Sequence, residues 1–477
     1  MNVTLSRNKI VSRHTLFFLA PTMLLPSPWT PRLARIEASA AERLARALAD
    51  DIVEGRLAGG DRLPAHRDLA DRLQIGLGSV TRAYALLERR GLTRSVKGRG
   101  TFVAARRTQG GEAIDLSSNA PPAAISERLL ARTLTAIARR IDADHFNSYA
   151  PPGGHAEHRR VLARWLQTLG LNVEPGHMVL TSSARQALSL ALDLVCQPRG
   201  RLLTERITYP GAIALARRKG CALQGLAMDA QGLLPQALAE ALHGIPAAEG
   251  KVLYLTPTLH NPTTATMGAE RRRAIVDICR NAGAWIIEDG VYAACSPDHA
   301  RLAHLATLAP EITLHVNGLS KSLGPGLQVG TLVLPPALCG AALATLQELS
   351  MAPSALSCAV VDEWLSQGVV ASLQADLRHE AQRRVRLAAS HLAPHLGDSR
   401  LVLHPEAYNA WLPMEREAAD RLVSAAAALG VTLTDPGSLM VEPHDRASGL
   451  RICLGAPGLD DLDGALAQLA RLLTAEP

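Results

Sequence analysis

The 477-residue sequence lacks long apolar runs and tracts dominated by proline and glycine. No run of 18 or more apolar residues is present, which argues against a membrane-spanning helix. Hydrophobic residues make up 47% of the chain and charged residues 20%, which argues against a disordered protein. A chain of this length is expected to form roughly two to four domains.

Cysteine is scarce and unpatterned. The seven cysteines are odd in number and form no CxxC pair, so neither a disulfide framework nor a zinc site is expected from them. They are typical of reduced, mostly buried thiols in a cytoplasmic protein.

Lysine is also rare, because only five of the 50 basic residues are lysines and the rest are arginines. Unlike arginine, lysine can lose its proton and act as a nucleophile, so a retained lysine can mark imine chemistry. Lys321 stands between two serines in GLSKSLGPGLQVG, residues 318–330. On composition alone, a solvated surface lysine remains the simpler interpretation.

Positive charge is concentrated at one end of the chain. Residues 1–110 contain 19 Lys and Arg against 9 Asp and Glu, whereas the remainder contains 31 against 35. Such asymmetry indicates a nucleic-acid or membrane partner for the basic part. Residues 1–28 imitate a signal peptide, but we expect a disordered extension or a start codon placed too far upstream, because helical patterning begins just after residue 33.

The basic part has the pattern of a winged helix-turn-helix. Apolar residues at four-residue steps predict a helix over 36–56, and further helices are expected at 65–74 and 76–92. A β-hairpin turning at 97–100 follows and forms a wing with two cations at its tip. Four cations, Arg67, Arg82, Lys97 and Arg99, either contact DNA phosphates or belong to a solvated charged face.

Three segments resemble the GntR-type winged-helix family: DRLPAHRDLADRL, SVTRAYALLERRGL and GRGTFV. The resemblance covers about seventy residues of a domain placed at 29–103. It implies double-stranded DNA as a partner, with the third helix in the major groove. By position, the resemblance places five residues at the DNA surface: Arg67, Ser79, Thr81, Arg82 and Gly98.

After a linker at 104–113, residues 114–477 read as an α/β domain. Short apolar strands alternate with helical segments, which predicts a mostly parallel sheet covered by helices on both faces. Ligands of such sheets bind beyond the carboxyl ends of the strands. Polar residues follow five of these strands: Ser183, Tyr209, Asn261, Asp289 and Lys321.

Each of these residues has an ordinary structural explanation when taken singly. Together they suit an aldehyde cofactor that carries a phosphate and a pyridine ring. A lysine can form the Schiff base, a carboxylate can keep the ring nitrogen protonated, and a helix amino terminus can hold the phosphate. The combination predicts pyridoxal 5'-phosphate.

The motifs HNPT (260–263), DGVY (289–292), SKS (320–322) and LRICLG (450–455) resemble fold-type I aminotransferases. The resemblance implies Lys321 as the Schiff-base lysine, with Ser320 beside it, and Asp289 as the pyridinium partner. It further implies that Asn261 and Tyr292 hold the ring hydroxyl and that Tyr209 stacks on the ring. Phosphate contacts are implied for Ser183, Ala184 and Arg185, and a ligand carboxylate for Arg451.

A winged helix followed by such a domain resembles the MocR family of bacterial regulators over roughly residues 29–470. The resemblance implies a fold-type I aminotransferase-like domain with a smaller C-terminal α+β subdomain. It also implies a head-to-tail homodimer that senses an amino acid, an amine or the cofactor itself.

One position departs from that family, in which an arginine usually binds the phosphate seven residues after the lysine. Here the residue is Gln328, and losing a charge-assisted contact should cost roughly 1–2 kcal/mol. Arg185 stands where a small or amide side chain is commoner, so it is either the replacement charge or an exposed helix arginine.

Three functions therefore stay open. The leading hypothesis is a cytoplasmic, DNA-binding transcription regulator in which an effector reacts at Lys321. The alternatives are an active aminotransferase with an accessory DNA-binding domain and a regulator whose large domain is only an apo dimerisation scaffold.

Overall fold

The computed structural model describes residues 29, 33, 39–53, 56–57, 61–89, 92–96, 100–103, 113–140, 143–196, 200–296, 302–349, 352–396, 401–442, 445 and 447–475. The chain forms two compact units, Met1–Thr108 and Gln109–Pro477. The expectations for residues 1–28, for Lys97, Gly98 and Arg99, and for most of the 104–113 linker concern residues outside those described.

The first unit is the predicted winged helix-turn-helix. It contains α1 (Ala40–Val53), α2 (His66–Leu73), α3 (Leu77–Arg89) and the antiparallel hairpin of β1 (Thr93–Val96) and β2 (Gly100–Val103). The apolar face of α3 is buried in one cluster with Leu44 and Leu48 of α1, through Val80, Ala83, Tyr84 and Leu87. Tyr84 of α3 also donates a hydrogen bond to the Pro64 carbonyl oxygen (2.9 Å), which fixes α3 to the segment before α2.

The second unit contains the remaining elements. Its helices are α4 (Glu127–Ala138), α5 (Asp144–Asn147), α6 (Ala156–Thr168), α7 (Ala184–Val195), α8 (Pro210–Arg218), α9 (Pro235–His243), α10 (Ala269–Ala282), α11 (Leu305–Leu308), α12 (Cys339–Leu349), α13 (Ala355–Ser366), α14 (Val369–Leu396), α15 (Arg416–Ala428) and α16 (Leu459–Ala475). Its strands are β3 (Ile114–Asp115), β4 (Met178–Thr181), β5 (Arg201–Glu205), β6 (Ala222–Leu226), β7 (Met228–Asp229), β8 (Gly232–Leu233), β9 (Lys251–Leu255), β10 (Trp285–Asp289), β11 (Thr313–Gly318), β12 (Gly330–Val333), β13 (Asn409–Glu415), β14 (Val431–Thr432) and β15 (Ala447–Cys453).

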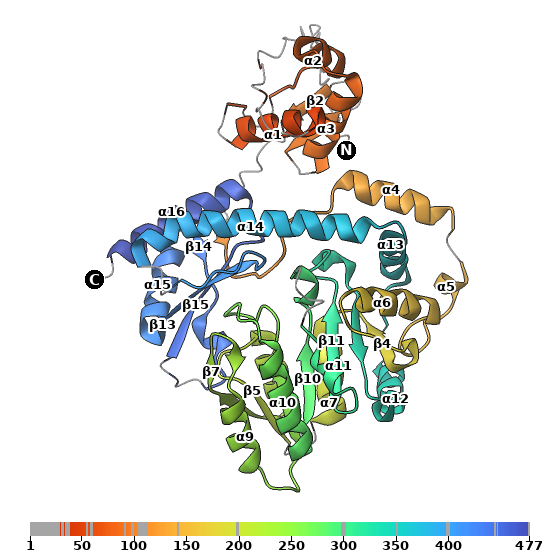
Figure 1. The fold of residues 1–477 in the computed structure, drawn as a ribbon, viewed down its shortest axis with the longest axis vertical. Helices are drawn as coiled ribbons and strands as arrows, with labels where there is room; N and C mark the ends of the chain where they lie inside the picture. Colours follow the sequence, from red (N-terminus) through yellow and green to blue (C-terminus); the bar gives the residue numbers. More distant parts are fainter. Residues whose placement is uncertain are drawn as a thin grey trace, which may run out of the picture. The chain divides into compact units, whose positions relative to one another are not determined.

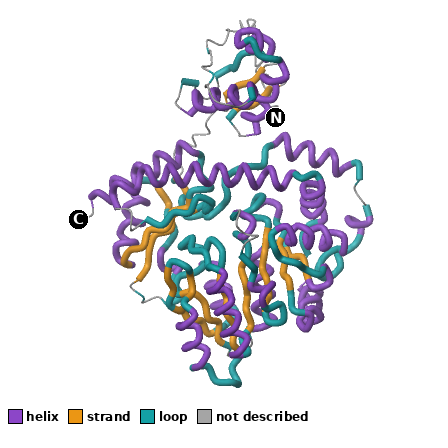
Figure 2. The backbone as a smooth tube through the Cα atoms, in the orientation of Figure 1, coloured by secondary structure: helices purple, strands orange, loops and turns teal. Residues whose placement is uncertain are grey.

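Seven of these strands form the central sheet, in the order β4-β12-β11-β10-β9-β5-β6 (Figures 1 and 2). The pairs from β11 across to β6 are parallel, whereas β12 runs antiparallel to both of its neighbours, so the sheet is mostly parallel as predicted. Neighbouring strand residues pack on opposite faces. Ile287 packs in the cluster with α7, and Ile286 packs in the cluster with α10. By the same alternation, Asp289 and Glu288 face opposite sides of the sheet.

A smaller α+β subdomain lies at the C-terminal end of the unit. Antiparallel β13 and β15 pack with α14, α15 and α16 around one apolar cluster. Figure 1 shows α14 running from the side of α13 to the side of α16. The subdomain also takes in the start of the unit, because β3 pairs in parallel with β14. This pairing was not predicted, and it brings residues 116–120 toward the ends of the central strands.

Within the described part of the chain, no helix is both long enough and apolar enough to cross a membrane.

Candidate functional site

A cavity of about 500 Å³ lies at the carboxyl ends of the central strands. All ten residues that the sequence assigned to a cofactor line it: Ser183, Ala184, Arg185, Tyr209, Asn261, Asp289, Tyr292, Ser320, Lys321 and Gln328. Six further residues complete the lining: Ser182, Leu188, Thr256, Val291, Pro325 and Val329. These ten residues are spread over positions 183 to 328 of the sequence, but the parallel strand order brings them to one edge of the sheet.

The amino terminus of α7 forms one wall of this cavity. Ser183 caps the helix, because its Oγ accepts a hydrogen bond from the Gln186 N–H (3.2 Å). Ser182 is held by Gln186, whose Oε1 accepts from the Ser182 hydroxyl at 2.8 Å. A helix amino terminus presents unpaired N–H groups and a positive dipole end, so this wall suits an anion.

Gly330 in β12 allows the close approach of α7 to the sheet. A Cβ on Gly330 would lie 2.5 Å from the Ser183 carbonyl carbon and 2.8 Å from the Ala184 nitrogen. Gly318 of β11 is similarly close, since a Cβ there would meet the Ala184 nitrogen at 3.1 Å. These two glycines therefore fix the position of the turn that begins α7.

Arg185 and Gln328, the two residues at unusual positions, line the same cavity. The Arg185 guanidinium is exposed and donates to the Tyr209 hydroxyl oxygen at 3.1 Å. Gln328 is also exposed and has a left-handed backbone conformation (φ 50°) after the turn Pro325–Leu327. The cavity thus contains one arginine next to the capped turn of α7 and a neutral amide at position 328.

Lys321 follows β11, and its side chain is half-buried. Its Nζ donates to the Asn119 carbonyl oxygen and lies 5.8 Å from the centre of the Tyr292 ring. Burial, with a smaller contribution from the charge of Arg451, lowers the pKa of the Lys321 amine to about 8, although the nearby Cys453 acts in the opposite direction. A neutral, nucleophilic amine is therefore far more accessible here than on an exposed lysine.

Asp289, at the end of β10, is buried and held from two sides. The Tyr254 hydroxyl donates to Asp289 Oδ2 (2.8 Å), and the Val291 N–H donates to Oδ1 (3.3 Å). Burial raises the pKa of Asp289 despite these hydrogen bonds. Its carboxylate would therefore be best stabilised by a cationic group of a ligand.

Arg451 does not line the cavity but contacts a residue that does. Its Nη1 donates to Asn261 Oδ1 (2.9 Å), and its Nη2 donates to the Ser117 carbonyl oxygen (2.9 Å) and to Thr434 Oγ1 (3.1 Å). Arg451 is 5% exposed. A ligand carboxylate that reached Arg451 would exchange with these protein oxygens.

Two contributors to the site were missed from the sequence. Asn119 donates through Nδ2 to the Tyr292 hydroxyl oxygen (2.9 Å), besides accepting from Lys321. Asn119 does not follow a strand of the central sheet, so the sequence pattern could not identify it. Its position in the site depends on the pairing of β3 with β14. Tyr254 pairs with Ile287 in register, so strand alternation puts it on the same face as Asp289, but this register is known only from the structure.

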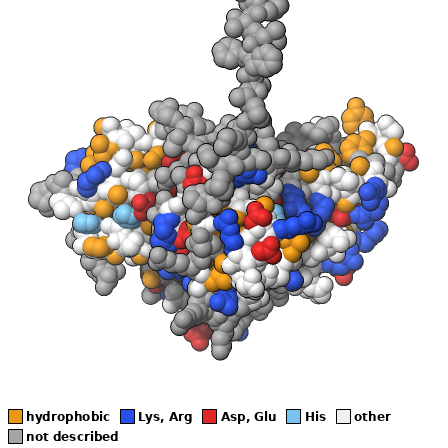
Figure 3. All heavy atoms as spheres, turned by 90° about the horizontal axis from the view of Figure 1, so that it is seen from above, with side chains coloured by type: hydrophobic (Ala, Val, Ile, Leu, Met, Phe, Trp, Pro, Cys, Tyr) orange, Lys and Arg blue, Asp and Glu red, His pale blue; other side chains and the backbone are white. Residues whose placement is uncertain are grey.

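The predicted DNA-contacting residues of the described chain lie on α2 and α3. Arg67 of α2 and Thr81 and Arg82 of α3 are exposed, and Ser79 is half-buried. On the face that Figure 3 draws, Lys and Arg side chains lie among acidic and apolar ones. The placement of these residues at a DNA surface rests on the helix-turn-helix and stays a prediction.

Comparison with known families matches both units. Residues 111–469 match the family Aminotransferase class I and II, and residues 40–103 match the gntR family of bacterial regulatory proteins. The domain combination expected from the sequence is thereby confirmed.

Similar chains include both regulators and aminotransferases. The HTH-type transcriptional regulator YdeF of Bacillus subtilis is 28% identical over 319 residues, covering 65% of this chain and 68% of YdeF. TauR of Rhodobacter capsulatus, also an HTH-type transcriptional regulator, is 26% identical and covers 63% of this chain and 68% of its own. Aminotransferase swnA of Metarhizium robertsii is 33% identical, but covers only 39% of each chain.

Solved structures show the same fold for the second unit. An archaeal alanine:glyoxylate aminotransferase matches with a TM-score of 0.70 at 21% identity, over 78% of this chain and 93% of that one. The α-aminoadipate aminotransferase LysN of Thermus thermophilus, solved with N-(5'-phosphopyridoxyl)-L-leucine, matches with a TM-score of 0.67 at 21% identity, over 76% and 92%. The chain belongs to the class I and II aminotransferase family, with a gntR-family winged helix-turn-helix preceding that domain.

Proposed function

We propose that this protein is a DNA-binding transcription regulator whose large domain binds pyridoxal phosphate at Lys321 and responds to an amino acid, an amine or the cofactor itself. The observation that carries the proposal is the cavity that contains Lys321, Asp289 and the capped turn of α7 together. The gntR-family domain and the regulators among the similar chains support the assignment to transcription rather than metabolism. Because such a regulator acts on chromosomal DNA, we place the protein in the cytoplasm.

The residues of the cavity fit this cofactor. The amino terminus of α7, with Ser183, Ala184 and Arg185, would hold the phosphate, because it combines a helix dipole with an arginine. Asp289 would face the ring nitrogen, and Lys321 the aldehyde. The glycines that admit α7 to the sheet support the same assignment, since a side chain at Gly330 would displace the phosphate wall.

The remaining residues would position the ring. Asn261 and Tyr292 would contact its hydroxyl group, and Tyr209 would cover its face with Ser320 and Gln328 nearby. When bound, the cofactor supplies an electrophilic aldehyde that amines capture covalently.

The chain's own residues prepare Lys321 for that capture. Burial lowers the pKa of its amine to about 8, and the Asn119 carbonyl oxygen orients Nζ. Tyr254 fixes the Asp289 carboxylate. Arg451, which contacts Asn261, would recognise an effector carboxylate. An effector carboxylate that bound Arg451 would replace its hydrogen bonds to Ser117 and Thr434. If this replacement is easier in one conformation of the large domain than in another, the effector would favour that conformation.

On the DNA side, α3 would enter the major groove of an operator, with Arg67 of α2 at the phosphates. Aminotransferase-fold proteins are typically dimers, and we propose a head-to-tail homodimer here. Two winged helices then require a repeated or palindromic operator of fixed spacing. Lys97, Gly98 and Arg99 of the wing belong to the same proposed surface.

Cofactor capture is tested with purified full-length protein and added pyridoxal phosphate. We expect visible absorption, and after borohydride reduction a labelled peptide that contains Lys321. Lys321→Ala should abolish the label, whereas the matched control Lys219→Ala, an outer lysine paired with Asp193, should retain it. If borohydride labelled another lysine, or none, the proposed sensing at Lys321 would be wrong. The large domain would then be only a dimerisation scaffold.

Regulation is tested by footprinting the DNA upstream of the gene. We expect Arg82→Ala to weaken binding and to reduce the salt dependence of binding by about one phosphate contact. Amino acids or amines added to the Lys321→Ala protein should no longer change the footprint. Rapid amino-acid turnover that requires Lys321, together with a footprint insensitive to every amine, would favour the active aminotransferase instead.

A further inference from the structure

Behind Asp289, on the opposite face of the sheet, lies a buried cluster that the cofactor site does not use. Glu288 of β10, His315 of β11 and His304, just before α11, are all at least 97% buried. Glu288 and His315 are direct register partners. One ligand atom from each of the three side chains lies within 4.8 Å of the others.

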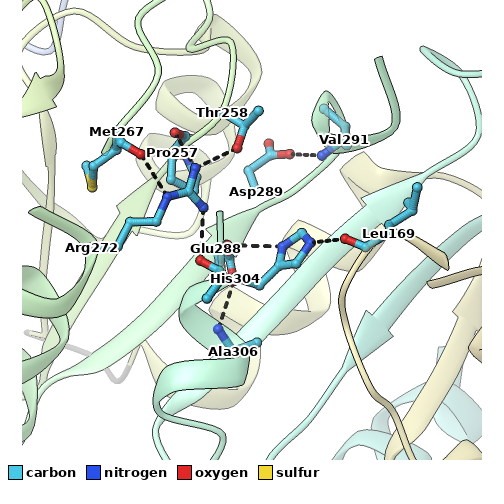
Figure 4. A network of polar contacts seen from close by, with 11 residues as sticks. Leu169, Pro257, Thr258, Met267, Arg272, Glu288, Asp289, Val291, His304 and Ala306 are labelled. Carbon is cyan, nitrogen blue, oxygen red and sulfur yellow. Dashed lines mark hydrogen bonds and ion pairs between the residues drawn. The ribbon is translucent and has the colours of Figure 1, made fainter. Parts of the chain in front are cut away.

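Two of the three side chains are already oriented by outer partners. His304 Nε2 donates to the Leu169 carbonyl oxygen (3.0 Å), so in the neutral imidazole the lone pair lies on Nδ1. That Nδ1 lies 3.4 Å from Glu288 Oε1, while Glu288 Oε2 accepts from the Ala306 N–H (2.9 Å; Figure 4). A histidine whose second nitrogen is held by a carbonyl, next to a held carboxylate, is typical of metal ligands.

His315 supplies an independent observation. Its ring packs edge-on against that of His304, with 5.0 Å between centres. Neither of its ring nitrogens has a hydrogen-bond partner among the described residues, although the side chain is completely buried. A buried polar group without a partner costs free energy. An ion that accepts a nitrogen lone pair would remove that cost.

We propose that Glu288 Oε1, His304 Nδ1 and a ring nitrogen of His315 bind one divalent transition-metal ion, and that this ion is zinc. Two imidazoles and one carboxylate suit zinc, whereas calcium and magnesium prefer oxygen ligands throughout. The 3.4 Å between His304 Nδ1 and Glu288 Oε1 fits two ligands on one tetrahedral ion with bonds of roughly 2.0–2.2 Å. His315 is the ligand that must turn toward the ion.

Arg272 is the nearby cation, and it leaves Glu288 Oε1 available. Its guanidinium donates to the carbonyl oxygens of Pro257, Met267 and Ala303 and to Thr258 Oγ1 (Figure 4). An ion on the cluster would tie β10, β11 and the segment entering α11 together. These two strands carry Asp289 and lead into Lys321, so the ion would stiffen the support of the cavity.

Zinc binding is measured on the full-length protein after chelator treatment and dialysis. With zinc added back in competition with a chromophoric chelator, we expect one tightly bound ion per chain and a higher melting temperature. His315→Leu and His304→Leu should each weaken zinc binding at least tenfold. The matched control is His158→Leu, which removes another buried imidazole, 2.5 Å from Asp362 Oδ2, and should leave the affinity unchanged.

X-ray absorption at the zinc edge of the wild-type protein does not depend on the folding of any variant. We expect nitrogen and oxygen neighbours with imidazole scattering and no sulfur. Sulfur neighbours would place the ion on cysteines and overturn the proposal. So would a wild-type protein that binds no stoichiometric zinc, or an affinity that His315→Leu leaves unchanged.

Discussion

At the scale of single residues, the chemistry of the site rests on what burial does to one amine. Lys321 is one of five lysines in a chain that otherwise uses arginine, and it is the one that lines the cavity together with Asp289. An exposed lysine would be almost fully protonated at neutral pH, whereas burial brings the pKa of Lys321 to about 8.

The first prediction concerns pH. Since only the neutral amine reacts, and burial lowers the pKa of Lys321, its rate of reaction with pyridoxal phosphate should rise from pH 7 and level off by about pH 9. Stopped-flow absorbance would measure it against a free lysine amide, whose rate should keep rising beyond about pH 10. Parallel profiles for the protein and the free amide would contradict the assignment.

A second prediction concerns Arg185 and Gln328. Restoring a charge with Gln328→Arg should tighten pyridoxal phosphate binding by about five- to thirty-fold, since a charge-assisted contact contributes roughly 1–2 kcal/mol. Arg185→Ala should weaken binding by a similar factor if Arg185 supplies the missing charge. Equilibrium dialysis would give both constants. An unchanged constant in Arg185→Ala would make Arg185 an ordinary exposed arginine whose partner is Tyr209.

At the scale of elements, the contact between β12 and the amino terminus of α7 decides where the first turn of that helix lies in the cavity. The contact exists because position 330 has no side chain. The turn of α7 is therefore fixed by a strand that runs antiparallel to both of its neighbours in an otherwise parallel sheet.

We therefore expect Gly330→Ala to weaken pyridoxal phosphate binding about tenfold or more, because its Cβ would lie 2.5 Å from the Ser183 carbonyl carbon and push α7 away. Gly326→Ala is the matched control, since a Cβ there meets no atom within 4 Å. Titration of the cofactor absorbance would compare them. Equal affinities in the two variants would show that the α7 turn does not hold the phosphate.

At the scale of the whole molecule, the two compact units have separate cores. Calorimetry should accordingly show two unfolding transitions. Pyridoxal phosphate at about a hundred times its dissociation constant should stabilise only the larger unit, by about 2.7 kcal/mol. Lys321→Ala should lose most of this shift. A single transition, or an equal shift of both, would show that the units unfold together.

The sequence by itself determined the winged helix, the mostly parallel sheet and five strand-end residues of the cavity lining, and the family resemblance added five more of the sixteen lining residues. The spacing of apolar residues shows which face of a helix or strand is buried, and this information is local in the sequence. Polar residues that follow parallel strands meet at one edge of the sheet, and this follows from the order of strands and helices. Only the tertiary structure decided the role of Asn119, which depends on the pairing of β3 with the distant strand β14. Only the tertiary structure shows that Glu288, His304 and His315 lie together. Contact between Glu288 and His315 depends on the register of β10 and β11, and the position of His304 depends on the segment before α11, neither of which is encoded in the spacing of apolar residues.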